Sequence, residues 1–159
     1  MLIKKILLLI ITILSGLFKF LLSILLQVGK HYFNQDYAVK KKVLIVDDKP
    51  TIAKVIQVYI SETFECVYFE DPIRAIAWLQ EGHLPDLIIS DINMPNMSGV
   101  DFLDYVKKND LFKSIPFVIL SSEDSTSQKI ALLERGADDY ISKPFNPMEL
   151  KVRLKKIVS

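Results

Sequence analysis

The sequence predicts an α/β fold, a doubly wound five-stranded parallel sheet, preceded by a separate hydrophobic helix. From residue 43 onward, short apolar runs alternate five times with segments whose apolar residues recur at helical spacing. Repeated strand–helix units form a parallel sheet with helices on both faces. A sharp change of composition near residue 30 separates this region from an almost wholly aliphatic segment. We therefore expect a hydrophobic helix at 1–29, a basic linker at 30–41 and a globular domain at 42–159.

The expected strands are short apolar runs. In chain order they are VLIV (43–46), ECVYFE (65–70), DLIIS (86–90), IPFVILS (115–121) and DYIS (139–142). The third run is apolar until Ser90, which is typical of a parallel strand covered on both faces. Right-handed crossovers should connect the strands.

The segments between the strands predict helices at 51–62, 71–82, 99–109, 124–135 and 147–158. Asp71 is the expected N-cap of the second helix. Gly82 and Gly136 are the expected stops of the second and fourth helices. Pro147 suits the first turn of the last helix.

Composition excludes several classes of function. The formal net charge of +1 gives no overall field to attract nucleic acid, and we expect no nucleic-acid partner. The single cysteine, Cys66, excludes an intramolecular disulfide and a cysteine-rich zinc site. Its apolar surroundings predict a buried structural thiol. His31 and His83 are isolated and suggest no metal site or catalytic triad.

Five polar residues stand at the carboxyl ends of the expected strands: Asp47, Asp48, Asp91, Ser121 and Lys143. In an open parallel sheet the carboxyl ends of the strands line one edge, where ligands bind. Adjacent carboxylates repel unless a cation neutralises them, and oxygen ligands suit Mg²⁺ or Mn²⁺. A carboxylate can also act as a nucleophile and form an acyl phosphate. Lys143 could balance the phosphoryl charge, and Ser121 could donate a hydrogen bond.

These residues resemble the receiver domain of two-component response regulators, which has a flavodoxin-like (βα)5 fold. The resemblance covers about residues 42–158 and rests on VLIVDD, DINMPNMSG, the serine pair at 121–122 and ISKPF. The spacings also agree, with 43 residues from Asp48 to Asp91, 30 from there to Ser121 and 22 more to Lys143. The ordered set is far more specific than any one of its motifs.

The resemblance implies a role for each matching residue. Asp91 is the implied phosphoacceptor and, with Asp48, a direct ligand of Mg²⁺. Asp47 would act on the ion through water, and the backbone carbonyl of Asn93 would be a further ligand. Lys143 would contact the phosphoryl oxygens.

The resemblance also implies a switch. Ser121 would move toward the phosphoryl group, and Tyr140 would turn inward behind it. The peptide bond between Lys143 and Pro144 is expected to be cis, which is inexpensive only before proline. Gly99 fits the loop after the phosphorylation site, where glycine allows a positive φ. The side chains of Asn93 and Glu123, small or flexible, would admit a hydrolytic water, which implies a labile phosphate.

The predicted function is therefore phosphorelay signal transduction by a stand-alone receiver that is not itself an enzyme. A histidine kinase or phosphotransfer protein would phosphorylate Asp91, and the output would be contact with an unknown downstream protein. A Mg²⁺-dependent phosphohydrolase is an enzymatic alternative, but it needs a second Asp where Asn93 stands. A phosphate sink or scaffold is a third possibility that the sequence does not exclude.

The segment Ile6–Val28 is long enough to span a bilayer and contains one charge, Lys19. On a helix its polar residues fall on one stripe with Lys30: Thr12, Gly16, Lys19, Ser23 and Gln27. The helix could span the membrane, with the stripe toward a partner helix, or lie flat in the interface. We expect a tether that holds a cytoplasmic receiver at the inner face of the cell membrane. A signal peptide and a misassigned start codon are the alternatives.

Overall fold

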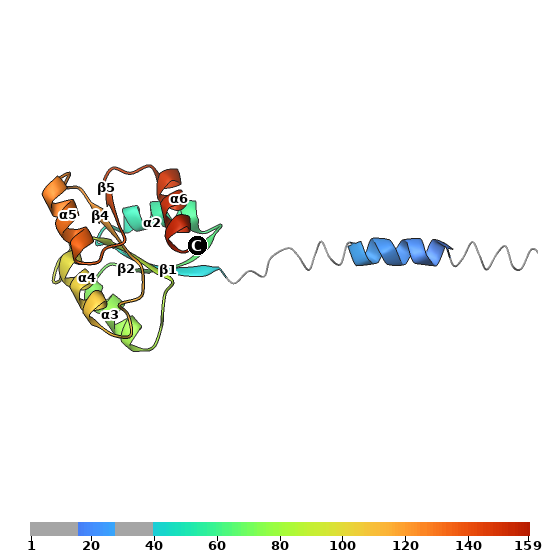
Figure 1. Cartoon of the computed structure of the whole chain (residues 1–159), viewed down its shortest axis with the longest axis horizontal. Coiled ribbons are helices and arrows are strands. Elements are labelled where there is room, and N and C mark those ends of the chain that lie inside the picture. The colour runs from blue at the N-terminus through green and yellow to red at the C-terminus, as the bar shows by residue number, and fades with distance from the viewer. Residues whose placement is uncertain (1–15, 28–39) are drawn as a thin grey trace, which may run out of the picture. The chain divides into compact units, whose positions relative to one another are not determined.

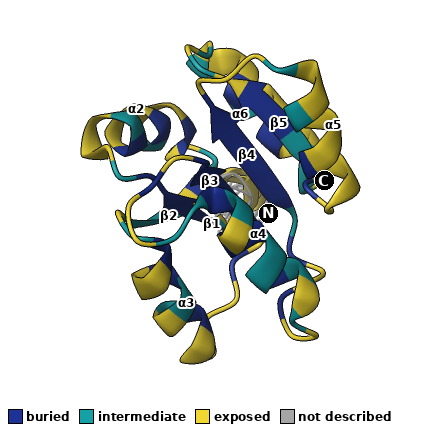
Figure 2. Cartoon of the chain, turned by 90° about the vertical axis from the view of Figure 1, so that its left-hand side faces the viewer, coloured by how far each residue is buried: buried dark blue, intermediate teal, exposed yellow. Residues whose placement is uncertain are grey.

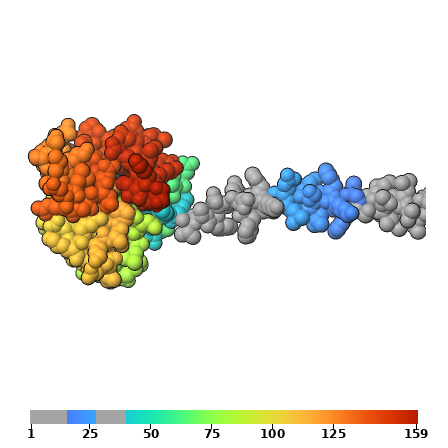
Figure 3. All heavy atoms as spheres, in the orientation of Figure 1, coloured from blue at the N-terminus to red at the C-terminus, as the bar shows by residue number. Residues whose placement is uncertain are grey.

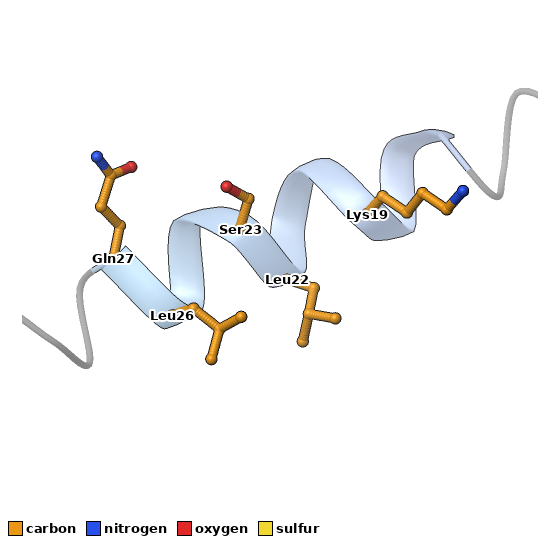
Figure 4. A pocket seen from close by; sticks show the side chains of 5 residues that line it. All are labelled: Lys19, Leu22, Ser23, Leu26 and Gln27. Atoms are coloured by element: carbon orange, nitrogen blue, oxygen red, sulfur yellow. The ribbon is translucent and has the colours of Figure 1, made fainter.

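The computed structural model describes residues 16–27 and 40–159 of the chain. It divides into two units, Met1–Val39 and Lys40–Ser159, which are described separately. In the first unit, residues 16–27 form a helix whose side chains are all exposed (Figure 1). Lys19, Ser23 and Gln27 follow one another at intervals of four residues along this helix (Figure 4). Thr12 and Lys30, at the ends of the predicted stripe, lie outside the described residues.

No helix within 16–27 or 40–159 combines the length and the hydropathy needed to cross a membrane.

The second unit contains one five-stranded parallel sheet, as the sequence predicts. Its strands are β1 (Lys41–Val46), β2 (Phe64–Phe69), β3 (Leu87–Asp91), β4 (Phe117–Ser121) and β5 (Asp139–Ser142). Their order across the sheet is β2-β1-β3-β4-β5, and every pair is parallel. The third strand ends one residue later than predicted, so that Asp91 belongs to the strand itself.

Helices follow the strands in the predicted alternation. They are α2 (Pro50–Ile60), α3 (Pro72–Gln80), α4 (Gly99–Lys108), α5 (Thr126–Glu134) and α6 (Pro147–Ile157). The side chain of Asp71 caps α3 by accepting a hydrogen bond from the amide of Ile73 at 2.8 Å. Gly82 and Gly136 follow α3 and α5 with φ of 93° and 101°, a conformation that favours glycine. The two glycines therefore end their helices as predicted.

Two buried cores lie on opposite faces of the sheet, whose buried strands are dark blue in Figure 2. Leu44 and Val46 of β1 pack in one core with residues of α3, α4 and α5. Val43 and Ile45 pack in the other core with residues of α2 and α6. This alternation follows from the two-residue period of a strand. Because β2 is at the edge of the sheet, Cys66 is only half-buried, in contrast to the buried thiol that the sequence predicts.

A candidate metal and phosphoryl site

The carboxyl ends of four strands bring the five sequence-predicted residues together at one edge of the sheet. Asp47 and Asp48 follow β1, Asp91 and Ser121 end β3 and β4, and Lys143 follows β5. Carboxylate oxygens of the three aspartates lie within 4.8 Å of one another. Asp47, Asp91 and Ser121 are buried, although all three are polar.

Lys143 bridges two of these carboxylates. Its Nζ lies 2.7 Å from Oδ2 of Asp47 and 2.7 Å from Oδ1 of Asp91. The backbone amide of Lys143 donates to the carbonyl of Ser121 at 2.6 Å, and the peptide bond to Pro144 is cis, as expected. The ammonium group therefore neutralises part of the negative charge at a fixed position between the strand ends.

Every polar group of Asp47 has a partner. Its amide donates to the carbonyl of Phe69 at 3.2 Å, and its carbonyl accepts from the hydroxyl of Tyr68 at 3.0 Å. One carboxylate oxygen accepts from the amide of Lys49 at 2.9 Å, and the other faces Lys143. Burial raises the pKa of the Asp47 carboxyl, although the hydrogen bonds from Lys143 and Lys49 oppose this shift. These hydrogen bonds therefore hold both the backbone and the carboxylate of Asp47 in place.

The carboxylate of Asp48, unlike that of Asp47, has an oxygen without a partner in the described part of the chain. Its Oδ1 is buried and has no hydrogen-bond partner among the residues that the structure describes. An unpaired buried carboxylate oxygen is costly unless a cation or water satisfies it. The donor set of three carboxylates contains only oxygen, the ligand type that Mg²⁺ and Mn²⁺ prefer. These residues therefore fit a divalent cation, with Asp48 as the side chain most available to it.

The loop after Asp91 is closed at its base. The amide of Asn93 donates to Oδ2 of Asp91 at 3.2 Å, and the amide of Gly99 donates to the carbonyl of Ile92 at 2.7 Å. A Cβ added at Gly99 would lie 1.9 Å from the backbone oxygen of Asp91. The expectation of a positive φ at Gly99 is wrong. The residue of this loop with a positive φ is Asn96, at 66°. Gly99 is required because helix α4 begins against the strand end.

Ser121 and Tyr140 contact the same residue of the loop between β4 and α5. The Oγ of Ser121 accepts a hydrogen bond from the amide of Glu123 at 3.0 Å. The hydroxyl of Tyr140 donates to the carbonyl of Glu123. Tyr140 is buried, with its side chain turned inward. The two predicted switch residues are therefore linked through the backbone of Glu123, a connection that no sequence motif indicates.

The sequence analysis also missed Tyr68, whose hydroxyl holds the backbone of Asp47. The residue lies in the edge strand and resembles any other aromatic residue of a half-buried strand. Its position in β2, beside β1, was the only available signal, because the direction of its side chain depends on the register of the two strands.

Comparisons with known proteins agree with this geometry. The family model described as the response regulator receiver domain matches residues 43–155. The chain is 39% identical over 121 residues to the phosphate regulon transcriptional regulatory protein PhoB of Pseudomonas aeruginosa. The matched region covers 76% of this chain and 52% of that protein. The chain thus spans about half the length of the curated relatives first matched.

Solved structures show the same fold. The chemotaxis response regulator CheY4 of Vibrio cholerae is 33% identical to the chain, with a TM-score of 0.69 over 74% of this chain and 98% of that one. The Mn²⁺-bound form of response regulator Rcp1 is 28% identical, with a TM-score of 0.63 over 74% of this chain and 91% of that one.

Proposed function

The chain belongs to the response regulator receiver domain family, and from this premise we propose that Asp91 accepts the phosphoryl group in a two-component phosphorelay. The donor is the phosphohistidine of a histidine kinase or phosphotransfer protein. A carboxylate oxygen of Asp91 forms the new P–O bond while the P–N bond of the donor breaks, and the imidazole leaves. The observation that carries this proposal is the position of Lys143, between Asp91 and Asp47, with the unpaired oxygen of Asp48 in the same acidic cluster.

The acidic cluster is the proposed Mg²⁺ site. Asp48 and Asp91 would hold the ion directly, Asp47 would act through water because its oxygens already have partners, and the carbonyl of Asn93 would complete the protein ligands. When bound, the ion neutralises charge on the phosphoryl oxygens. Lys143 adds a second positive charge and orients the Asp91 carboxylate.

Phosphorylation would be read out through Ser121 and Tyr140. A phosphoryl group on Asp91 offers the hydroxyl of Ser121 a new acceptor, and movement of the side chain toward it would break the hydrogen bond that Oγ accepts from the amide of Glu123. A shift of Glu123 then alters the hydrogen bond that holds Tyr140. The surface formed by α5, β5 and α6 would change and bind a downstream protein. The atoms of these elements are orange to red in Figure 3.

Phosphorylation by acetyl phosphate tests the proposal. In the presence of Mg²⁺ the protein should gain one base-labile phosphate, and Asp91→Asn should gain none. Asp110→Asn is the matched control because Asp110 is an exposed carboxylate that precedes the amino end of β4, whereas the site lies at the carboxyl ends of the strands, and this variant should be phosphorylated like the wild type. Phosphate that persists on Asp91→Asn would exclude Asp91 as the acceptor.

We also propose three parts for the chain: a membrane-associated helix (1–29), a basic linker (30–41) and a cytoplasmic receiver (42–159). Support comes from residues 16–27, where a helix exposes apolar side chains that include Leu17, Phe18 and Leu25. Flotation of the full chain with phospholipid vesicles tests the tether, and replacement of Leu17, Phe18 and Leu25 by serine should reduce flotation. Equal flotation of this variant, or none by the wild type, would contradict the tether.

A further inference from the structure

Tyr68 connects the edge strand to the acidic site. It stands opposite Ile45 in the pairing of β1 with β2, and its ring packs against the core formed with α2 and α6. Its hydroxyl donates to the carbonyl of Asp47 at 3.0 Å. That carbonyl belongs to the peptide group joining Asp47 to Asp48. The edge strand therefore holds the backbone on which two of the three carboxylates are mounted.

A second contact from the same strand holds the other backbone group of Asp47. The amide of Asp47 donates to the carbonyl of Phe69 at 3.2 Å, so β2 binds both backbone groups of Asp47. The amide contact continues the ordinary parallel ladder, whereas the contact from Tyr68 depends on a side chain. The amide contact anchors the peptide between Val46 and Asp47, whereas the Tyr68 contact anchors the peptide between Asp47 and Asp48. Without the hydroxyl, the peptide between the two aspartates loses this anchor and can rotate more freely.

The orientation of the Asp48 carboxylate is the property most affected by such rotation. Its buried Oδ1 has no partner within the described residues, so no hydrogen bond to that oxygen holds it toward the metal site. Asp47, by contrast, has the amide of Lys49 and the ammonium of Lys143 on its carboxylate. The orientation of Asp48 is therefore set chiefly by its backbone.

We propose that Tyr68 is a positioning residue for divalent cation binding, because its hydroxyl fixes the Asp47–Asp48 peptide and thereby aims the Asp48 carboxylate. The inference rests on the proposed function, since it assumes that the acidic cluster binds Mg²⁺.

The test is the Mg²⁺ dissociation constant of the full chain, measured by titration calorimetry, for the wild type and Tyr68→Phe. Loss of one positioning hydrogen bond should weaken binding roughly fivefold. Tyr105→Phe is the matched control, because it also removes one hydroxyl and one hydrogen bond, from the Gln80 side chain at 2.9 Å. Its dissociation constant should equal that of the wild type.

A second measurement separates positioning from chemistry. At saturating Mg²⁺, Tyr68→Phe should be phosphorylated by acetyl phosphate at the wild-type rate, and at low Mg²⁺ more slowly. An unchanged dissociation constant, or an equal weakening in Tyr105→Phe, would overturn the role of Tyr68. Wild-type protein that binds no Mg²⁺ would overturn both proposals. Mg²⁺ binding that depends on Tyr68, without phosphate on Asp91, would support this inference and contradict only the phosphorelay.

Discussion

The middles of strands β1, β3 and β4 and their carboxyl ends are both buried, but they have opposite chemistry. Ile45, Ile88 and Ile119 are completely inaccessible, while Asp47 and Asp91 at the ends are 1% and 3% exposed. Burial of an apolar side chain stabilises the fold, whereas burial of a carboxylate opposes folding, as the raised pKa of Asp47 indicates. The same strands therefore provide stability in their middles and a site of buried, destabilising carboxylates at their ends.

The first prediction concerns the loss of a side chain from the apolar core that packs on the middles of the strands. Phe102 of α4 is fully buried and packs edge-on against Phe117 of β4, with ring centroids 5.4 Å apart. Phe102→Ala should lower the free energy of unfolding by about 4 kcal/mol, measured by urea denaturation. Leu111→Ala, at a position 73% exposed, should change it little. Similar losses in the two variants would mean that the middle of the domain is not its stabilising core.

The second prediction concerns the boundary between the two regions, where α4 begins against the end of β3. Gly99→Ala should cost about 3 kcal/mol of unfolding free energy, because the new methyl group meets the backbone oxygen of Asp91. Gly82→Ala introduces a side chain at positive φ but into open space, and it should cost only about 1 kcal/mol. Calorimetric melting compares the two variants, and a larger loss at Gly82 would show that the contact at Gly99 is unimportant.

The third prediction is that a bound cation stabilises the protein by relieving the repulsion between the carboxylates at the strand ends. Mg²⁺ at about 100 times its dissociation constant should raise the free energy of unfolding by ~2.7 kcal/mol. Asp48→Asn should lose most of this gain, because it removes a charge from the carboxylate with the unpaired oxygen. Thermal melts with and without Mg²⁺ measure the effect. Equal stabilisation of both proteins would place the ion elsewhere.

The fourth prediction concerns the pH dependence that Asp47 imposes. Its carboxyl has a higher pKa in the folded state than in the unfolded state, so ionisation favours unfolding. This destabilisation is absent below the unfolded pKa, grows as the pH rises, and is complete above the folded pKa. In Mg²⁺-free buffer, Asp47→Asn should therefore be more stable than the wild type by roughly 1 kcal/mol at neutral pH. Urea denaturation should show this advantage vanishing in acid, and an advantage that is constant with pH would contradict the burial argument.

The sequence predicts the apolar part of this comparison well, because strand and helix periodicity follow directly from which side chains are buried. It also predicts that Asp47, Asp91 and Lys143 meet, because the carboxyl ends of parallel strands share an edge. It could not predict that Glu123 joins Ser121 to Tyr140 or that Tyr68 holds Asp47. Those contacts depend on side-chain directions across neighbouring strands and on loop conformation, which no local pattern encodes.

The hydrogen bond between Gly99 and Ile92 makes the loop after Asp91 a closed ring. The hydrogen bond that closes the ring joins backbone atoms, while the side chain of Asn93 within it is exposed. Asn93 can therefore be exchanged without moving β3 or α4, whereas Met94 lies in the core and Ser98 caps α4. For protein engineering, position 93 offers one replaceable side chain beside the acidic cluster, with its neighbours left as part of the scaffold.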